Sequence, residues 1–136
     1  MSKLTTPTEQ IETLYQRYLN AWNSRDFKGV AACFSEPAFY ALPGMDVSIP
    51  DRASFVALLE KVFVRLEADA FSHTEVGEIS AQACSEQMAI VDAKAVARLR
   101  KDGSYIEVID AHYVARQFDD GWRFTVAVTC NQGWQD

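Results

Sequence analysis

The sequence predicts an α+β domain in which three N-terminal helices pack in the concave face of a curved, mostly antiparallel sheet. Two observations lead to this prediction: apolar residues recur at helical spacing before Asp69, and they alternate with polar residues after it. Helices that precede a run of strands typically gather on one face of the sheet. Because 136 residues can build one hydrophobic core, we expect residues 1–136 to form a single domain.

Three helices are expected before residue 70. Thr6, Pro7 and Glu9 form a typical helix start, and the first helix continues to about residue 23. Asp26 begins a short second helix, and Pro50-Asp51 begins a third. The apolar side chains of the three helices are Ile11, Leu14, Tyr15, Tyr18, Leu19 and Trp22; Phe27, Val30, Ala31 and Phe34; and Phe55, Leu58, Leu59, Val62, Phe63 and Leu66.

Five strands are expected, one short and four long. The short strand covers residues 38–42 and ends at Pro43-Gly44. The long strands cover roughly 71–83, 87–100, 104–118 and 122–131, and hairpin-type sequences such as Lys101-Asp102-Gly103 separate them. Long strands joined by tight turns form an antiparallel meander. A long, twisted sheet covered by only three helices curls into a cone with an open mouth.

The strand over 87–100 suggests which face of the sheet is the inner one. One face has Asp92, Lys94 and Arg98, so charge assigns it to the outside. The inner face would then be a row of small residues, Ala89, Val91, Ala93, Ala95, Ala97 and Leu99. Such small side chains leave room for a ligand unless aromatic side chains from the helices fill the space.

Asp110 and His112 stand out in the next strand. Strand alternation puts them on one face with Ile106, Val108 and Val114. A carboxylate and an imidazole among branched apolar side chains are costly unless they pair or face a wet cavity, which indicates a pocket. Alternatively, they form a satisfied polar pair or face outward in an interface.

If Asp110 and His112 point inward, the other face of the same strand becomes an exposed apolar patch. Its members are Tyr105, Ile109, Ala111, Tyr113 and Ala115. Patches of this kind usually mark an interface, so we expect a homodimer through the outer face of the sheet.

Several segments resemble the NTF2-like superfamily, whose SnoaL-like and ketosteroid-isomerase-like members have a cystatin-like cone fold. They are YLNAWNSRDF over 18–27, FSEP over 34–37, RKDG over 100–103 and YVARQFDDGWRF over 113–124. The resemblance covers nearly the whole chain. It implies a pocket between helices and sheet, and the superfamily includes isomerases, dehydratases, cyclases and noncatalytic binding modules.

Compared with ketosteroid isomerases, the chain matches one functional position and departs at two. Tyr18 corresponds to an oxyanion-stabilising tyrosine, whereas Leu42 and Val114 stand where those enzymes have acids. Asp110 and His112 correspond to pocket-lining positions. Two functions follow as hypotheses: a cofactor-free isomerase, dehydratase or cyclase that uses His112 with Asp110, or a noncatalytic ligand-binding or dimerisation module.

The candidate catalytic residues are therefore His112 as acid or base, Asp110 as its support and Tyr18 as a hydrogen-bond donor. The expected ligand is a small apolar or mixed-polarity organic molecule. Its candidate binding residues are Tyr40, Leu42, Val108, Val114, Ala95, Ala97 and Asn131. Two histidines and scattered acids give no metal-ligand spacing, and no phosphate-binding loop is evident, so we expect neither a metal nor a cofactor.

Charge and composition argue against several partners and locations. The net charge of −6 without a basic cluster argues against nucleic-acid binding. The N-terminus lacks the apolar stretch of a signal peptide, and no run is long enough to span a membrane. The three cysteines, Cys33, Cys84 and Cys130, are typical of a reducing compartment, so we expect a cytoplasmic protein without membrane association.

Overall fold

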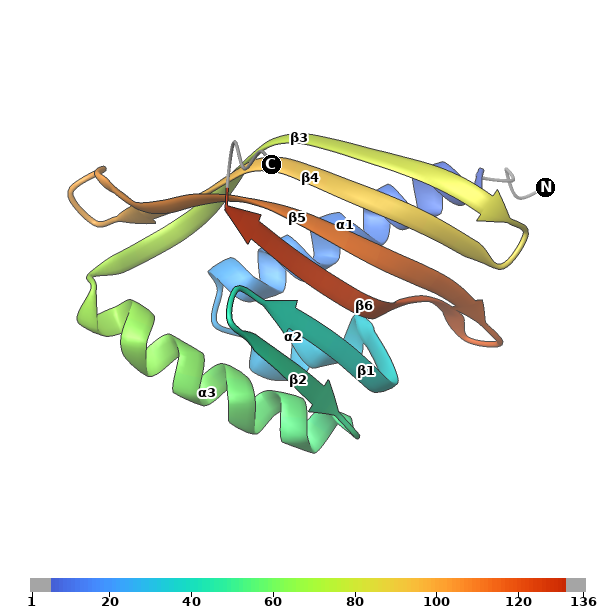
Figure 1. Ribbon diagram of the computed structural model, residues 1–136, viewed down its shortest axis with the longest axis horizontal. Helices are drawn as coiled ribbons and strands as arrows, with labels where there is room; N and C mark the ends of the chain where they lie inside the picture. The colour runs from blue at the N-terminus through green and yellow to red at the C-terminus, as the bar shows by residue number, and fades with distance from the viewer. Residues whose placement is uncertain (1–5, 132–136) are drawn as a thin grey trace.

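A computed structural model describes residues 6–131 and has the expected α+β architecture. Three helices lie against one six-stranded sheet, with α1 beneath the long strands and α3 at the lower edge of the view in Figure 1. The helices are α1 (Pro7–Asn23), α2 (Phe27–Ala32) and α3 (Arg52–Ala68). The strands are β1 (Phe34–Leu42), β2 (Met45–Ile49), β3 (Phe71–Ser85), β4 (Met88–Arg100), β5 (Tyr105–Phe118) and β6 (Gly121–Asn131).

The sheet order is β2-β1-β6-β5-β4-β3, so the last four strands form the expected meander. Every neighbouring pair is antiparallel except β1 and β6, which run parallel. Two details differ from the sequence prediction. The first strand begins at Phe34 instead of residue 38, and Pro43-Gly44 is a hairpin turn that leads into the unpredicted strand β2.

Polar side chains cap the helices where the sequence predicts their starts. The Thr6 hydroxyl accepts a hydrogen bond from the Glu9 amide at 3.1 Å. Asp26 accepts from the Gly29 amide at 3.0 Å, and Asp51 accepts from the Ser54 amide at 2.7 Å. Each bond satisfies an amide that has no partner inside its helix.

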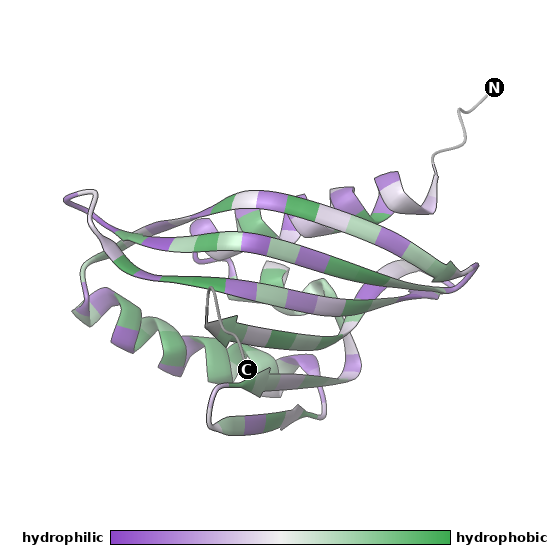
Figure 2. Ribbon diagram, turned by 45° about the horizontal axis from the view of Figure 1, so that its top comes forward, coloured by the Kyte–Doolittle hydropathy of each residue, from purple (hydrophilic) through white to green (hydrophobic). Residues whose placement is uncertain are grey.

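The core lies between α1 and one face of the sheet, which we call the inner face. Apolar and polar residues alternate along the strands in Figure 2, and the apolar set of α1 is buried against the sheet. At the last residue of α1, the side-chain amide of Asn23 donates to the Thr74 carbonyl at 3.0 Å and accepts from the Thr74 amide at 2.8 Å. This pair of bonds attaches the end of α1 to strand β3.

A bulge in β4 overturns the predicted inner face for half of that strand. Ala93 pairs with Ala111, but the next pair is Val96 with Ile109, so β4 carries one extra residue. An extra residue reverses the alternation of faces beyond it. Val96 and Arg98 therefore point inward, whereas Ala95 and Ala97 leave the inner face. The prediction was correct only for the first part, where Ala89, Val91 and Ala93 are buried.

The predicted facing of β5 is also wrong. Ile109, Ala111, Tyr113 and Ala115 are buried in the core, so they do not form an outer patch. Asp110, His112, Val108 and Val114 are half-buried on the opposite, outer face. Both faces of this strand are rich in apolar residues, so alternation alone could not tell them apart.

Candidate functional site

Two adjoining cavities lie between the helices and the inner face of the sheet. The smaller, which we call the tyrosine chamber, has a volume of about 20 Å³. The larger, which we call the α3 groove, has a volume of about 410 Å³. Trp22, Tyr40 and Arg98 line both of them, so the two cavities adjoin at these three residues.

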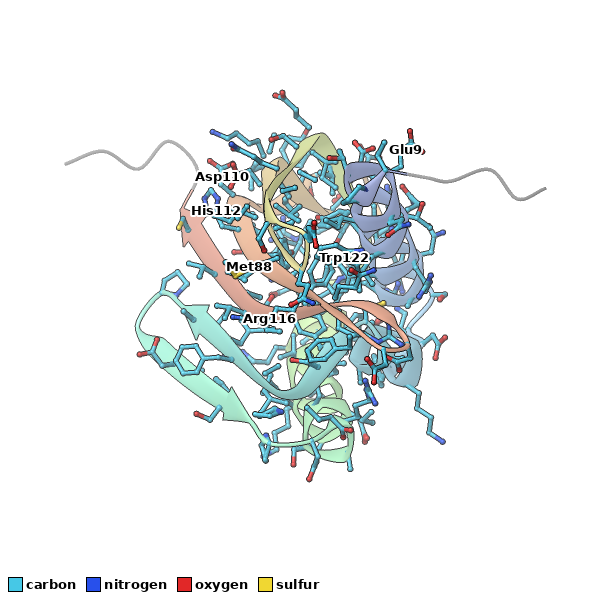
Figure 3. All side chains as sticks on the ribbon, turned by 90° about the vertical axis from the view of Figure 1, so that its right-hand side faces the viewer. Glu9, Met88, Asp110, His112, Arg116 and Trp122 are labelled. Atoms are coloured by element: carbon cyan, nitrogen blue, oxygen red, sulfur yellow. The ribbon has the colours of Figure 1, made fainter. Side chains whose placement is uncertain are left out.

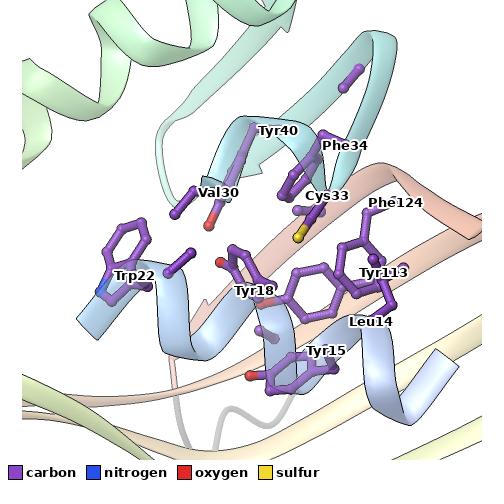
Figure 4. Close-up of a cluster of buried hydrophobic side chains, with 14 of the residues drawn as sticks. Leu14, Tyr15, Tyr18, Trp22, Val30, Cys33, Phe34, Tyr40, Tyr113 and Phe124 are labelled. Atoms are coloured by element: carbon purple, nitrogen blue, oxygen red, sulfur yellow. The ribbon is translucent and has the colours of Figure 1, made fainter. Parts of the chain in front are cut away.

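Four tyrosines from three elements line the tyrosine chamber. Tyr15 and Tyr18 come from α1, Tyr40 from β1 and Tyr113 from β5. Figure 4 shows the hydroxyl oxygens of Tyr18 and Tyr40 pointing toward one another. Edge-to-face contacts hold the rings, with Tyr18 and Tyr113 centroids 5.8 Å apart. These rings occupy most of the space above the small inner-face residues of the sheet.

Burial keeps these phenols protonated. It raises the pKa of Tyr15 to about 12 and raises the pKa of Tyr18 and of Tyr113 well above the ordinary value. Burial also raises the pKa of Tyr40. At neutral pH the four hydroxyls can therefore donate hydrogen bonds, but they cannot serve as bases.

Two polar atoms on residues that line the chamber are buried with no hydrogen-bond partner among residues 6–131. They are the indole nitrogen of Trp22 and the hydroxyl of Thr74, whose side chains are 7% and 6% exposed. A buried polar atom without a partner costs stability, which is why such atoms are rare in native proteins. The volume of the chamber is about that of one water molecule or one ligand oxygen.

Arg98 lies at the junction of the chamber and the groove. Its side chain is 18% exposed, and its Nη1 donates to Oε2 of Glu107 at 2.6 Å. The guanidinium carbon lies 5.5 Å from the centre of the Trp22 ring. The Arg98 guanidinium puts a positive charge on the buried side of the junction, and Glu107 lies at its more exposed edge.

The α3 groove is mostly apolar, with charged residues among its lining. Its apolar lining is Trp22, Tyr40, Leu42, Met45, Phe55, Leu58, Leu59, Val62, Leu66 and Ile106, and its charged lining is Arg65, Asp69, Arg98 and Glu107. Two other hollows, of about 540 and 630 Å³, lie beside the first turns of α1 and outside β1–β2. Neither of them shares a lining residue with the tyrosine chamber.

Three of the candidate residues from the sequence line these cavities. Tyr18 lines the chamber, Leu42 lines the groove and Tyr40 lines both. Ala95, Ala97, Val108 and Val114 line neither cavity, because the β4 bulge and the facing of β5 turn them away. The side chain of Asn131 lies outside the described part of the structure.

His112 and Asp110 do not form the predicted pair. Figure 3 shows both on the side of the sheet away from α1. His112 Nδ1 is 2.6 Å from Oδ1 of Asp92, and Oδ1 of Asp110 accepts a hydrogen bond from the Ala95 amide at 3.0 Å. The sheet therefore separates the expected acid–base pair from the cavities.

Sequence reasoning missed the main polar residues of the site. Strict alternation over 87–100 places Arg98 on the outer face, and the facing predicted for 104–118 places Glu107 on the outer face with Tyr105 and Ile109. Val96 was a signal that could have revealed the bulge in β4, since an apolar residue interrupts the charged face between Lys94 and Arg98. The sequence pattern places Trp22 among the apolar side chains of the first helix and Tyr113 in the expected outer patch. Thr74 gives no signal of its own.

Residues 6–131 have no group of three or more histidine, cysteine, aspartate or glutamate side chains able to hold a metal ion. Among the same residues, no helix has the length and apolar character needed to cross a bilayer.

Comparisons with known proteins identify the family. Residues 8–132 match the family described as "NTF2-like protein (DUF6841)", so the chain belongs to this NTF2-like family. No curated protein matches the sequence.

Solved structures show the same fold. An NTF2-like protein with a cystatin-like fold from Novosphingobium aromaticivorans superposes with a TM-score of 0.77 at 21% identity, over 93% of this chain and 82% of that one. A ketosteroid isomerase-like protein from Erwinia carotovora atroseptica superposes with a TM-score of 0.68 at 19% identity, over 93% and 96%. At such identities the likeness concerns the fold.

The protonated tyrosines predict a loss of stability at alkaline pH. Tyrosines in the unfolded chain ionise near about pH 10, before the buried ones do, so the unfolded state binds fewer protons above that pH. The free energy of unfolding should then fall between about pH 10 and pH 12, by about 1.4 kcal/mol per pH unit for each phenol that stays protonated.

Urea unfolding across this pH range tests the prediction. Tyr15→Phe should reduce the fall in the free energy of unfolding across this pH range. Tyr105→Phe, at a residue that is 62% exposed, should leave that fall as in the wild type. Equal pH dependence in all three proteins would contradict the assignment.

Proposed function

We propose that this protein binds a small, mostly apolar organic molecule in the α3 groove, with a polar end of the molecule directed toward the tyrosine chamber. The observation that supports this most strongly is that Trp22, Tyr40 and Arg98 line both cavities, which places the polar chamber directly beside the apolar groove. The groove volume of about 410 Å³ is within the usual range for small-molecule sites. An apolar wall with few polar groups at one end is also typical of such sites.

The chemistry of the cavities favours binding over proton transfer. The tyrosines donate hydrogen bonds but stay protonated, because their pKa values are raised. The histidine expected to act as a base lies on the outer face of the sheet, where it contacts Asp92. A cofactor-free isomerase or dehydratase would have to use Glu107 or Asp69, and Glu107 is already paired with Arg98.

A neutral fluorescent probe, N-phenyl-1-naphthylamine, tests groove binding. We expect the wild type to bind it and Val62→Lys to weaken binding about tenfold, because a charge would enter the apolar groove. Val64→Lys is the matched control: it lies on the same helix, is 71% exposed and lines no cavity described above. Fluorescence titration with unfolding midpoints for each variant separates binding from stability. An equal loss in both variants, or no binding by the wild type, would refute groove binding.

We further propose that two copies associate through the outer face of the sheet. Strand register places Ile90 beside Val114, Val114 beside Val126 and Val126 beside Phe39, which makes an apolar row across four strands. Ile90 is 46% exposed and Phe39 is 39% exposed. An uncovered apolar row on a sheet face is typical of an interface.

Oligomeric state tests this second proposal. Ile90→Glu should raise the dimer dissociation constant at least about tenfold, because it would bury a charge in the interface. Val64→Glu, on the exposed side of α3, should leave the dissociation constant unchanged. Sedimentation equilibrium of the three proteins gives the answer, and a monomeric wild type would rule out the pairing.

A further inference from the structure

Arg98 has hydrogen-bonding capacity that its protein partner does not use. Of its three guanidinium nitrogens, Nη1 is bonded to Glu107, and the other two have no hydrogen-bond partner among residues 6–131. The side chain is mostly buried and lies over the Trp22 ring. A guanidinium offers five N–H donors in a planar fork, which matches the two oxygens of a carboxylate.

The groups beside Arg98 are also suited to an oxygen acceptor. Among residues 6–131 the indole N–H of Trp22 and the Thr74 hydroxyl have no hydrogen-bond partner, and both residues are more than nine-tenths buried and line the same chamber as Arg98. The chamber lining includes no aspartate or glutamate. The two acids of the groove, Asp69 and Glu107, are outside the chamber. A negatively charged oxygen at the junction would therefore meet donors on the chamber side.

The β4 bulge is what brings Arg98 to this place. Ala95 has a φ of +54°, in the left-handed region that non-glycine residues rarely adopt. Its amide donates to the Asp110 carboxylate at 3.0 Å. On the other neighbouring strand, Gly77 leaves space: a Cβ there would lie 2.9 Å from the Cβ of Ala95. Backbone strain held in place from both sides commonly marks a functional arrangement.

From these observations we infer that the groove selects molecules that carry a carboxylate, which Arg98 binds, and that Asp110 is a positioning residue that turns Arg98 inward through the bulge. The inference rests on the proposed binding function and adds the chemical class of the ligand. The carboxylate of the ligand takes the free edge of the guanidinium, with one oxygen directed toward Trp22 and Thr74. Glu107 competes with the ligand for Arg98.

Two matched pairs of probes test the ligand class: 2-naphthoate against 2-naphthamide, and octanoate against octanamide. Each pair has the same apolar body and differs in charge. By isothermal titration we expect the wild type to bind each carboxylate about tenfold more tightly than its amide. Equal affinity within a pair would overturn the inference and leave groove binding intact. Failure to bind any of the four probes would count against both.

Variants at the ion pair separate its two partners. Arg98→Gln should abolish the preference for the carboxylate, so that each carboxylate and its amide bind with equal affinity. Glu107→Gln should increase carboxylate affinity, because it removes the competing acid. If Glu107→Gln instead weakened carboxylate binding, or if Arg98→Gln kept the preference, the role of Arg98 would be refuted.

Variants on the outer face test the positioning role. Asp110→Ala should lose the preference, whereas Asp110→Asn should keep it, because its amide oxygen can still accept from the Ala95 amide. Asp92→Ala is the matched control, since it removes an acid from the same face of the sheet. The Asp92 carboxylate contacts His112 and does not contact the bulge. If Asp110→Ala fails to fold, Asp110→Asn and Asp92→Ala still test the assignment. Loss of the preference in Asp110→Asn, or its retention in a folded Asp110→Ala, would contradict positioning by Asp110.

Discussion

The hydrogen bond from the Ala95 amide to Asp110 supports the feature on which the rest of the site depends. It stabilises a one-residue bulge in β4, and the bulge reverses which side chains of that strand face the helices. Without the bulge, Ala95 and Ala97 would face the helices and Arg98 would face solvent. The bulge that this bond supports thus places Arg98 at the junction of the two cavities. The residue that makes the bond lies on the face opposite to the cavity it shapes.

The interior then has two adjoining environments, an apolar groove and a chamber of hydrogen-bond donors. The α3 groove offers mostly apolar area, whose burial favours binding without specifying orientation. The tyrosine chamber offers hydrogen-bond donors that burial keeps protonated. A molecule with an apolar body and an oxygen-bearing end satisfies both, and the arginine at the junction would fix which end enters first. The same fold serves many functions in other proteins, so this assignment rests on the site itself.

Much of the fold could be predicted from the sequence, and much of the site could not. The capping residues Thr6 and Asp51, the helical periodicity and the hairpin turns are local signals, and the structure contains the elements they predict. Side-chain facing in the second half of β4 depends on a bulge between strands, which is a tertiary feature, and β5 has apolar residues on both faces, so alternation could not assign its inner face. Asp110 attracted attention for a valid reason, since a carboxylate among apolar residues needs a partner. Its partner is a backbone amide, and that cannot be read from strand alternation.

The most direct test of this account is a nuclear Overhauser measurement on the isotopically labelled wild-type protein. If β4 is bulged at Ala95, the methyl groups of Val96 should show cross-peaks to ring protons of the chamber, those of Tyr18 and Trp22 in particular. The methyl groups of Ala95 and Ala97 should show none to these rings. The contrary result is cross-peaks from Ala95 and Ala97 to the chamber rings and none from Val96. It would mean a regular strand with Arg98 on the outer face, and would contradict the account.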